Sequence, residues 1–141
     1  NKTGDAYGLG LKGSYDPFGG KIIFLPNMTY VLTKAKVDQD STDVFTYSMG
    51  MSAPINSQWT GSLTLKETET GRDGPDTTVS DLTREDDSFN WTVAFNWRKP
   101  GPPNKKIPMV ALTFSETETD SNILNFDTNT RDANLALTWV F

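Results

Sequence analysis

Polar side chains at every second position of several stretches are the residues that could do chemistry in this chain. Most carry hydroxyl or amide groups, which exchange neutral hydrogen bonds, and a few carry a positive charge. If these stretches form a closed sheet, the polar side chains line a watery lumen or a packed polar core. Such a surface suits a neutral or sugar-like solute, although any lumen must be polar. The set comprises Lys12, Asn27, Thr46, Ser48, Thr64, Lys66, Asn90, Asn96 and Arg98.

The chain lacks the side chains on which most enzymes depend. It has no cysteine and no histidine, so it offers no thiol nucleophile, no zinc–thiolate site and no imidazole base. Asp38, Asp40 and Asp43 match a calcium loop only in part, because no glycine stands at the sharp turn and no glutamate closes the loop. We therefore expect no enzyme activity, no cofactor and no metal. An outer-membrane enzyme with its histidine elsewhere in a longer protein stays open as an alternative.

Composition and charge exclude two further classes of protein, helical membrane proteins and nucleic-acid-binding proteins. Hydrophobic residues make up only 35% of the chain, and no stretch approaches the ~18 consecutive apolar residues of a transmembrane helix. The net charge of −5 argues against nucleic acid as a partner, since phosphate contacts need a basic surface.

Strict two-residue alternation of apolar and polar side chains predicts β-strands with two unlike faces. The clearest stretch has Phe89, Trp91, Val93, Phe95 and Trp97 on one face. We expect strands of about 9–11 residues, the length that crosses a bilayer at the tilt of a barrel strand. Seven stretches show the pattern: 7–15, 24–32, 45–51, 59–65, 89–97, 108–114 and 133–141.

The links between these stretches alternate in length, which predicts an up-and-down order and an orientation. The links at 16–20, 54–57 and 99–104 are short and rich in proline, glycine and asparagine. The links at 38–42, 67–88 and 116–128 are polar, and the last two are long and acidic. Bacterial outer-membrane barrels have short periplasmic turns and longer extracellular loops. We therefore expect the C-terminus in the periplasm and the long acidic loops outside the cell.

Seven strands do not make a complete bacterial barrel, because single-chain barrels have an even number of at least eight. The fold class predicted is all-β, with about seven antiparallel up-and-down transmembrane strands. Residues 1–141 are expected to form one barrel segment, the C-terminal part of a larger or multi-chain barrel. Upstream strands of the same protein or a neighbouring chain would complete it.

The last eight residues resemble the C-terminal signal that the barrel-assembly machinery reads in outer-membrane proteins. Asn134, Trp139 and Phe141 match that pattern, and Ala136 stands where the family has glycine. The segment 107–141 also resembles, weakly, the terminal hairpin of exopolysaccharide-exporter and surface-lipoprotein-assembly-modulator barrels. It does so through Pro108, the run 120–123 and the run 132–135. These resemblances imply a bacterial outer-membrane location, the barrel-assembly machinery as a partner, and export of a polysaccharide or a surface protein.

Aromatic residues near the strand ends predict contact with the lipid bilayer. Tyr7, Tyr15, Trp59, Phe89, Trp97 and Trp139 share the parity of the apolar face. Amphipathic rings of this kind form girdles at headgroup level. A soluble, carbohydrate-binding β-sandwich that stacks sugars on these rings is the alternative. We expect a pore, a translocation channel or a scaffold in the outer membrane.

Overall fold

Seven antiparallel β-strands form a single sheet in which neighbours along the chain are neighbours in space. The computed structural model describes residues 4–35, 40–75, 82–99, 107–123 and 126–140. The strands are β1 (Gly4–Lys12), β2 (Ile23–Ala35), β3 (Thr42–Pro54), β4 (Trp59–Arg72), β5 (Glu85–Arg98), β6 (Ile107–Ser121) and β7 (Thr128–Val140). The prediction of seven up-and-down strands is confirmed. No helix in the described residues is long and apolar enough to cross a membrane.

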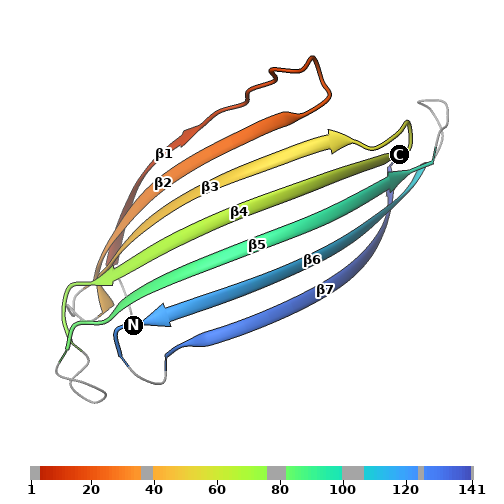
Figure 1. Ribbon diagram of the computed structural model, residues 1–141. Helices are drawn as coiled ribbons and strands as arrows, with labels where there is room; N and C mark the ends of the chain where they lie inside the picture. The colour runs from red at the N-terminus through yellow and green to blue at the C-terminus, as the bar shows by residue number, and fades with distance from the viewer. Residues whose placement is uncertain (1–3, 36–39, 76–81, 100–106, 124–125, 141) are drawn as a thin grey trace.

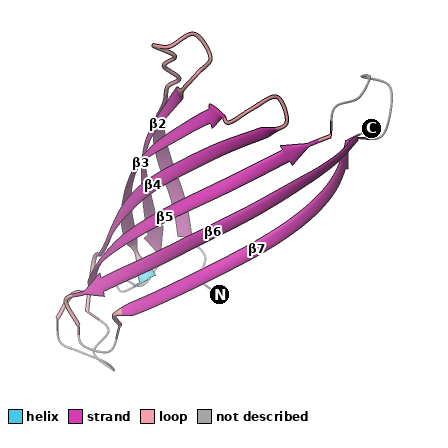
Figure 2. Cartoon of the chain, turned by 45° about the vertical axis from the view of Figure 1, so that its right-hand side comes forward, coloured by secondary structure: helices cyan, strands magenta, loops and turns pink. Residues whose placement is uncertain are grey.

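The sheet is curved like part of a barrel wall, and it does not close on itself (Figures 1 and 2). β1 and β7 are its two edges, and each is paired with one strand only. One end of the sheet carries the links that follow β2, β4 and β6, and we call it the loop end. The opposite end carries the links that follow β1, β3 and β5, and we call it the turn end.

Continuous pairing gives the sheet two faces of different character. The register runs one residue against one through every pair of strands, for example Met28 against Tyr47 and Asn27 against Ser48. On β3, Tyr47 and Met49 are exposed, whereas Thr46 and Ser48 are half-buried. A curved sheet crowds side chains on its concave side, so Thr46 and Ser48 lie on the concave side and Tyr47 and Met49 on the convex side.

Local hydrogen bonds shape the links that follow β1 and β3 at the turn end. Gly19 and Gly20 have φ angles of 62° and 82°, a region that side chains disfavour. The backbone N–H of Gly20 donates to the Asp16 carboxylate at 2.6 Å. After β3, the side-chain oxygen of Asn56 accepts hydrogen bonds from the backbone N–H groups of Gln58 (2.9 Å) and Trp59 (3.0 Å).

The strands are longer than predicted, and the acidic links are correspondingly shorter. β2 to β7 have 13 to 15 residues each, against the 9–11 expected. Residues 67–72 belong to β4, 85–88 to β5 and 116–121 to β6, so the prediction that they are loops was wrong. In 67–70 and 116–119 glutamate alternates with threonine, and 85–88 is acidic apart from Ser88, so none of these parts alternates apolar with polar residues.

Side-chain hydrogen bonds hold the links at the loop end against the sheet. The backbone N–H of Ala35 donates to the hydroxyl of the buried Ser41 at 2.9 Å. Asn122 joins the link before β5 to the link after β6. Its side-chain oxygen accepts from the N–H of Glu85 at 2.9 Å, and its amide donates to the carbonyl of Thr83 at 2.9 Å.

Candidate functional site: the two faces of the sheet

A row of polar side chains crosses all seven strands on the concave face. Five residues predicted to line a lumen lie in it, because the register aligns Lys12 with Asn27 and carries the row through Ser48 and Lys66 to Asn90. The same row continues to Thr117 and Thr130, which sequence reasoning missed. Thr117 falls in the predicted loop 116–128, although its β-branched side chain at an alternating position is a strand signal.

A second row, next to the first toward the loop end, is made almost entirely of hydroxyl groups. Of the predicted residues only Thr46 lies in it. The hydroxyls of Thr46 and Thr68 are 3.2 Å apart, and those of Ser88 and Thr119 are 2.8 Å apart. The row consists of Gly10, Thr29, Thr46, Thr68, Ser88, Thr119 and Thr128.

The remaining predicted residues lie toward the turn end and are not brought together. Thr64 pairs with Gly50 and Thr92 one row below Lys66. Asn96 and Arg98 lie further along β5, near its end. The predicted set is therefore a surface spread over the length of the concave face rather than a compact binding site.

Two asparagines in the central row have different environments. The Asn90 amide donates to the hydroxyl of Thr117 at 2.8 Å and to the carbonyl of Glu116 at 3.1 Å, and its oxygen accepts from the Thr92 hydroxyl at 3.2 Å. The side-chain oxygen of Asn27 is buried and has no hydrogen-bond partner among the described residues.

Charges are divided unequally between the faces of the strands. By register parity, Lys12, Lys66, Arg72 and Arg98 share the concave face with only two acidic strand residues, Asp86 and Asp132. Asp86 is paired with Arg84, at 2.7 Å between Oδ1 and Nε. Most acidic strand residues have the parity of the convex face, near the loop end.

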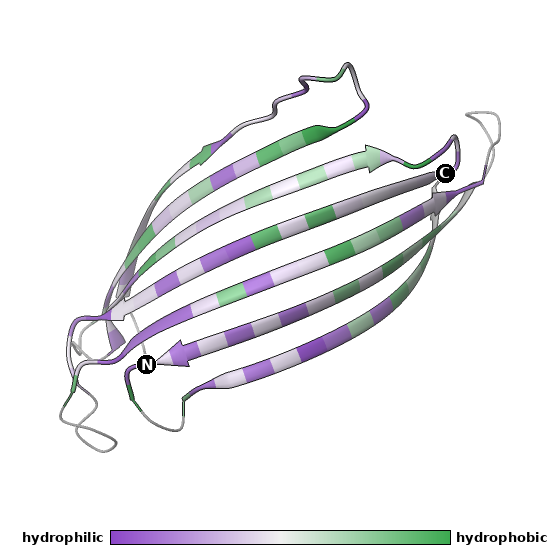
Figure 3. Cartoon of the chain, viewed as in Figure 1, coloured by the Kyte–Doolittle hydropathy of each residue, from purple (hydrophilic) through white to green (hydrophobic). Residues whose placement is uncertain are grey.

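The convex face changes from charged to apolar in a single step on every strand. Figure 3 shows hydrophilic colours toward the loop end of β4 to β7 and hydrophobic colours further along. Beyond the step, the convex side chains are large and exposed, as at Met28 (48%), Met49 (45%) and Phe89 (44%). From β1 to β7 the steps are Asp5/Tyr7, Lys34/Leu32, Asp43/Phe45, Glu67/Leu65, Asp87/Phe89, Glu116/Phe114 and Arg131/Ala133.

From β1 to β7 these steps shift overall toward the turn end, and the shift is uneven. Tyr7 and Leu32 share a row, as do Phe114 and Ala133, and Phe89 lies one convex row nearer the loop end than Leu65. The register carries the row of Ala133, the first apolar residue on β7, through Phe114 on β6 and finally to Tyr15 beyond β1. The first apolar residue on β1 is Tyr7, eight residues nearer the loop end than Tyr15. Eight residues span ~27 Å along a strand, and six spacings between strands span ~29 Å. A straight line drawn from the first step to the last therefore makes an angle of ~43° with the hydrogen-bonded rows.

Charged groups just on the loop side of this line are held by hydrogen bonds. The Glu116 carboxylate accepts from the Nε of Arg131 at 2.8 Å, from the amide of Asn129 at 3.2 Å and from the indole N–H of Trp91 at 3.2 Å. The indole of Trp91 thus lies on the apolar side with its N–H directed to a polar group.

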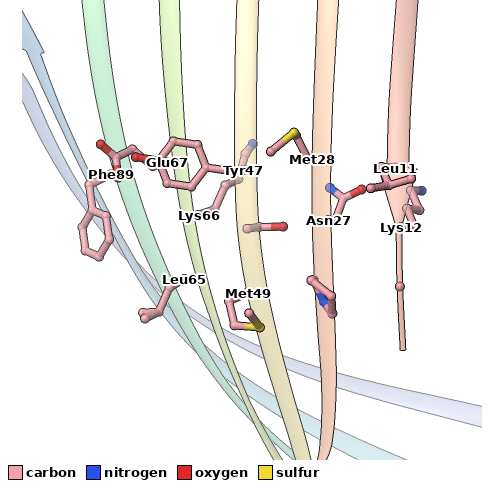
Figure 4. A pocket seen from close by; sticks show the side chains of 13 residues that line it. Leu11, Lys12, Asn27, Met28, Tyr47, Met49, Leu65, Lys66, Glu67 and Phe89 are labelled. Atoms are coloured by element: carbon pink, nitrogen blue, oxygen red, sulfur yellow. The ribbon is translucent and has the colours of Figure 1, made fainter. Parts of the chain in front are cut away.

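The apolar convex face is hollowed by a groove of about 650 Å³ that crosses β1 to β5. Figure 4 shows two rows of side chains with a gap between them; Tyr47 and Phe89 belong to one row, and Met49 and Leu65 to the other. The strand backbone around Ser48 forms its floor, so the groove offers mainly hydrocarbon surface. The lining comprises Leu11, Lys12, Gly13, Pro26, Asn27, Met28, Tyr47, Ser48, Met49, Leu65, Lys66, Glu67 and Phe89.

Tyr7, Phe89, Trp59 and Trp97, four of the predicted girdle residues, lie on the two sides of the apolar zone. Tyr7 and Phe89 border its charged edge, whereas Trp59 and Trp97 are register partners near the turn end. The Trp97 indole N–H reaches the side-chain oxygen of Gln58 at 3.4 Å. Of the signal residues, Asn134, Ala136 and Trp139 pair with β6 at Thr113, Ala111 and Pro108. Phe141 and the expected loop residue Asp38 lie outside the described residues.

Comparison with known proteins found no matching family model, no matching curated protein and no matching solved structure. The two faces of the sheet are therefore the features that point to a function.

Proposed function

We propose that this chain forms part of the wall of a transmembrane β-barrel in the bacterial outer membrane, and that the barrel is a pore or translocation channel. The convex face contacts lipid, and the concave face lines an aqueous path. The observation that carries the proposal is the diagonal line at which the convex face turns from charged to apolar.

A membrane surface meets a sheet of tilted strands along a diagonal line. The plane of the membrane crosses the hydrogen-bonded rows at the angle by which the strands tilt from the membrane normal. The line crosses the rows at ~43°, and strands of outer-membrane barrels tilt by about 35–45°. A sheet in water has no reason to place one sharp boundary obliquely across all its strands.

The height of the apolar zone supports the same proposal. On β5 it runs from Phe89 to Trp97, which is ~27 Å along the strand and ~20 Å after projection at the inferred tilt. The apolar band of outer-membrane barrels is about 25 Å tall. The strand residues on the loop side of the line then stand outside the membrane, where charged side chains meet water.

The two alternative classes receive less support. A carbohydrate-binding sandwich packs two sheets face to face and buries the apolar faces between them. Here all seven described strands belong to one sheet, and large apolar side chains remain exposed. For an enzyme barrel, the described residues offer no histidine, so the concave face lacks the usual base.

The concave face suits a hydrophilic cargo. Its rows of hydroxyl and amide groups exchange hydrogen bonds with water or with sugar hydroxyls. A polysaccharide fits this surface best, and a surface protein passing in an extended form would meet the same groups. The resemblance of the C-terminal hairpin to exporter barrels points to the same two cargo classes.

Neighbouring residues on β4 provide a test of the pore, because Lys66 faces the concave side and Glu67 the convex side. We expect the protein to stay in the membrane pellet after alkaline carbonate extraction and to give ion currents in planar bilayers. Lys66→Glu should shift the current toward cations, because it places a negative charge beside the path of the ions.

Glu67→Lys is the matched control, since it reverses a charge on the same strand but outside the path. It should leave ion selectivity nearly unchanged. Release of the protein by carbonate would contradict the membrane location. Absence of current, or equal effects of the two substitutions, would contradict the pore.

A further inference from the structure

The two edge strands of the sheet, β1 and β7, have few of the features that prevent an edge strand from pairing with another strand. Soluble proteins protect edge strands with prolines, bulges, inward charges or short lengths. β7 has 13 residues and no proline, and its segment from Ala133 to Val140 carries no charge. β1 has charges only near its ends, at Asp5 and Lys12. Both strands pair with their one neighbour without a bulge.

Apolar residues at these edges are among the most exposed in the structure. On the convex face Leu9 is 80% exposed and Leu11 is 74% exposed on β1, and Leu135 is 71% exposed on β7. Each lies beside backbone N–H and C=O groups on the side that has no neighbouring strand. Such groups are strongly destabilising when they are left unpaired away from water.

The directions of β1 and β7 restrict what can pair with them. Seven alternating strands make the first and the last run the same way, from the loop end to the turn end. Direct pairing of β1 with β7 would therefore be parallel in an otherwise antiparallel sheet. A second copy in the same orientation would meet this sheet through the same parallel seam, and an inverted copy would place its loop end at the wrong side of a membrane.

We propose that each edge pairs with a strand that runs from the turn end to the loop end, so that an odd number of added strands completes the barrel. The partner is a β-wall of different sequence, not a second copy of this sheet. Its flanking strands carry apolar residues opposite Leu9 and Leu135 and polar residues on the concave face. This inference rests on the proposed membrane-spanning barrel, but it does not depend on whether the concave face conducts ions.

Photo-crosslinking in native membranes tests the direction of the partner strands. A photoreactive amino acid is placed singly at Ala6 or Lys12 on β1, and at Thr130 or Asn134 on β7, all on the concave face. Mass spectrometry then identifies the captured residues. We expect Ala6 to capture a residue that comes later in the partner sequence than the one captured by Lys12, and Thr130 a later one than Asn134.

Capture in the same sequence order would show parallel pairing and overturn the proposal. Capture of β7 by the β1 probes, or no capture of protein by any probe, would also overturn it. The order of captured residues does not depend on conductance, so failure here and failure of the pore proposal are distinguishable.

Disulfide trapping provides a second readout, because the chain has no cysteine of its own. Thr113→Cys with Asn134→Cys joins register partners on β6 and β7 and should form a disulfide, which makes it the positive control. Asn134→Cys combined in turn with Ala6→Cys, Gly8→Cys or Lys12→Cys should form none, either within a chain or between copies. A disulfide in any of these edge pairs would show direct closure and overturn the proposal.

Discussion

Asn90 and Asn27 lie in the same row of the concave face, yet their side chains are held differently. Asn90 bridges β5 to β6 through hydrogen bonds to Thr117 and to the carbonyl of Glu116. Asn27 has a buried side-chain oxygen without a hydrogen-bond partner among the described residues. The side chain of Asn90 therefore contributes to the stability of the sheet through hydrogen bonds, whereas the side-chain oxygen of Asn27 makes no such contribution within the described part of the chain.

Replacing these asparagines should have unequal effects on stability. We expect Asn90→Ala to lower the free energy of unfolding by about 1–2 kcal/mol, because it removes hydrogen bonds and leaves the Thr117 hydroxyl without this donor. Asn27→Ala in the same row should cost less than about 0.5 kcal/mol. Urea titration of the protein refolded in lipid vesicles measures both, and equal costs would contradict the hydrogen bonding described.

Val93 and Ala94 are adjacent on β5 and have opposite parity. Val93 lies midway along the apolar zone, whereas Ala94 faces the concave side. We expect Val93→Arg to cost about 2–4 kcal/mol, the cost of a charge on the lipid face near the membrane midplane. Ala94→Arg should cost much less, since its charge reaches water. A larger loss of stability for Ala94→Arg than for Val93→Arg, measured by refolding into bilayers, would show that the two faces are assigned the wrong way round.

At the scale of the strands, sequence alternation predicted their number, order and faces but not their ends. In the apolar half of each strand, apolar and polar residues alternate along the sequence, as Phe95 and Asn96 do, so the strand is easy to recognise. Toward the loop end both faces are polar, so this contrast disappears. The segments 67–70 and 116–119 both read Glu-Thr-Glu-Thr, with glutamate on the convex face and threonine on the concave face. Threonine at every second position was the remaining strand signal.

The candidate surface was predictable to a similar extent. Parity alone assigned Lys12 and Asn27 to one face, but alignment of residues on different strands depends on register, which link lengths and hydrogen bonds set. The sequence therefore could not show that five predicted residues share one row. It also could not show that the charged-to-apolar steps form one line.

Asn122 should control the stability of the links at the loop end. It holds Thr83 and Glu85 through two hydrogen bonds of 2.9 Å. We expect Asn122→Ala to raise the rate of trypsin cleavage at Arg84 several-fold in intact cells, since local opening would become more frequent. Asn129→Ala, which alters a hydrogen bond on the strand instead, is the control and should leave that rate nearly unchanged. Cleavage that occurs only after the periplasm is opened would show that the loop end faces the periplasm and would contradict the proposed orientation.

At the scale of the whole molecule, the proposed membrane plane would explain features that lie far apart in the sequence. It accounts for the charged-to-apolar step on each of seven strands, for exposed hydrophobic residues on the convex face and for the acidic character of the strand ends. The ~43° inclination of the line fits the tilt of barrel strands, and such a tilt would hold the apolar zone level in the proposed membrane.

Depth measurement in the bilayer is the most direct test of this central claim. A fluorophore is attached to single cysteines at Tyr7, Ala133 and Phe24, and its quenching by lipids brominated at known depths is compared. Ala133 and Phe24 share a hydrogen-bonded row, whereas Tyr7 and Ala133 lie on the diagonal line. We predict equal depths for Tyr7 and Ala133, with Phe24 about 16 Å nearer the opposite membrane surface. Equal depths for Ala133 and Phe24, or no quenching at any of the three positions, would contradict a tilted transmembrane wall.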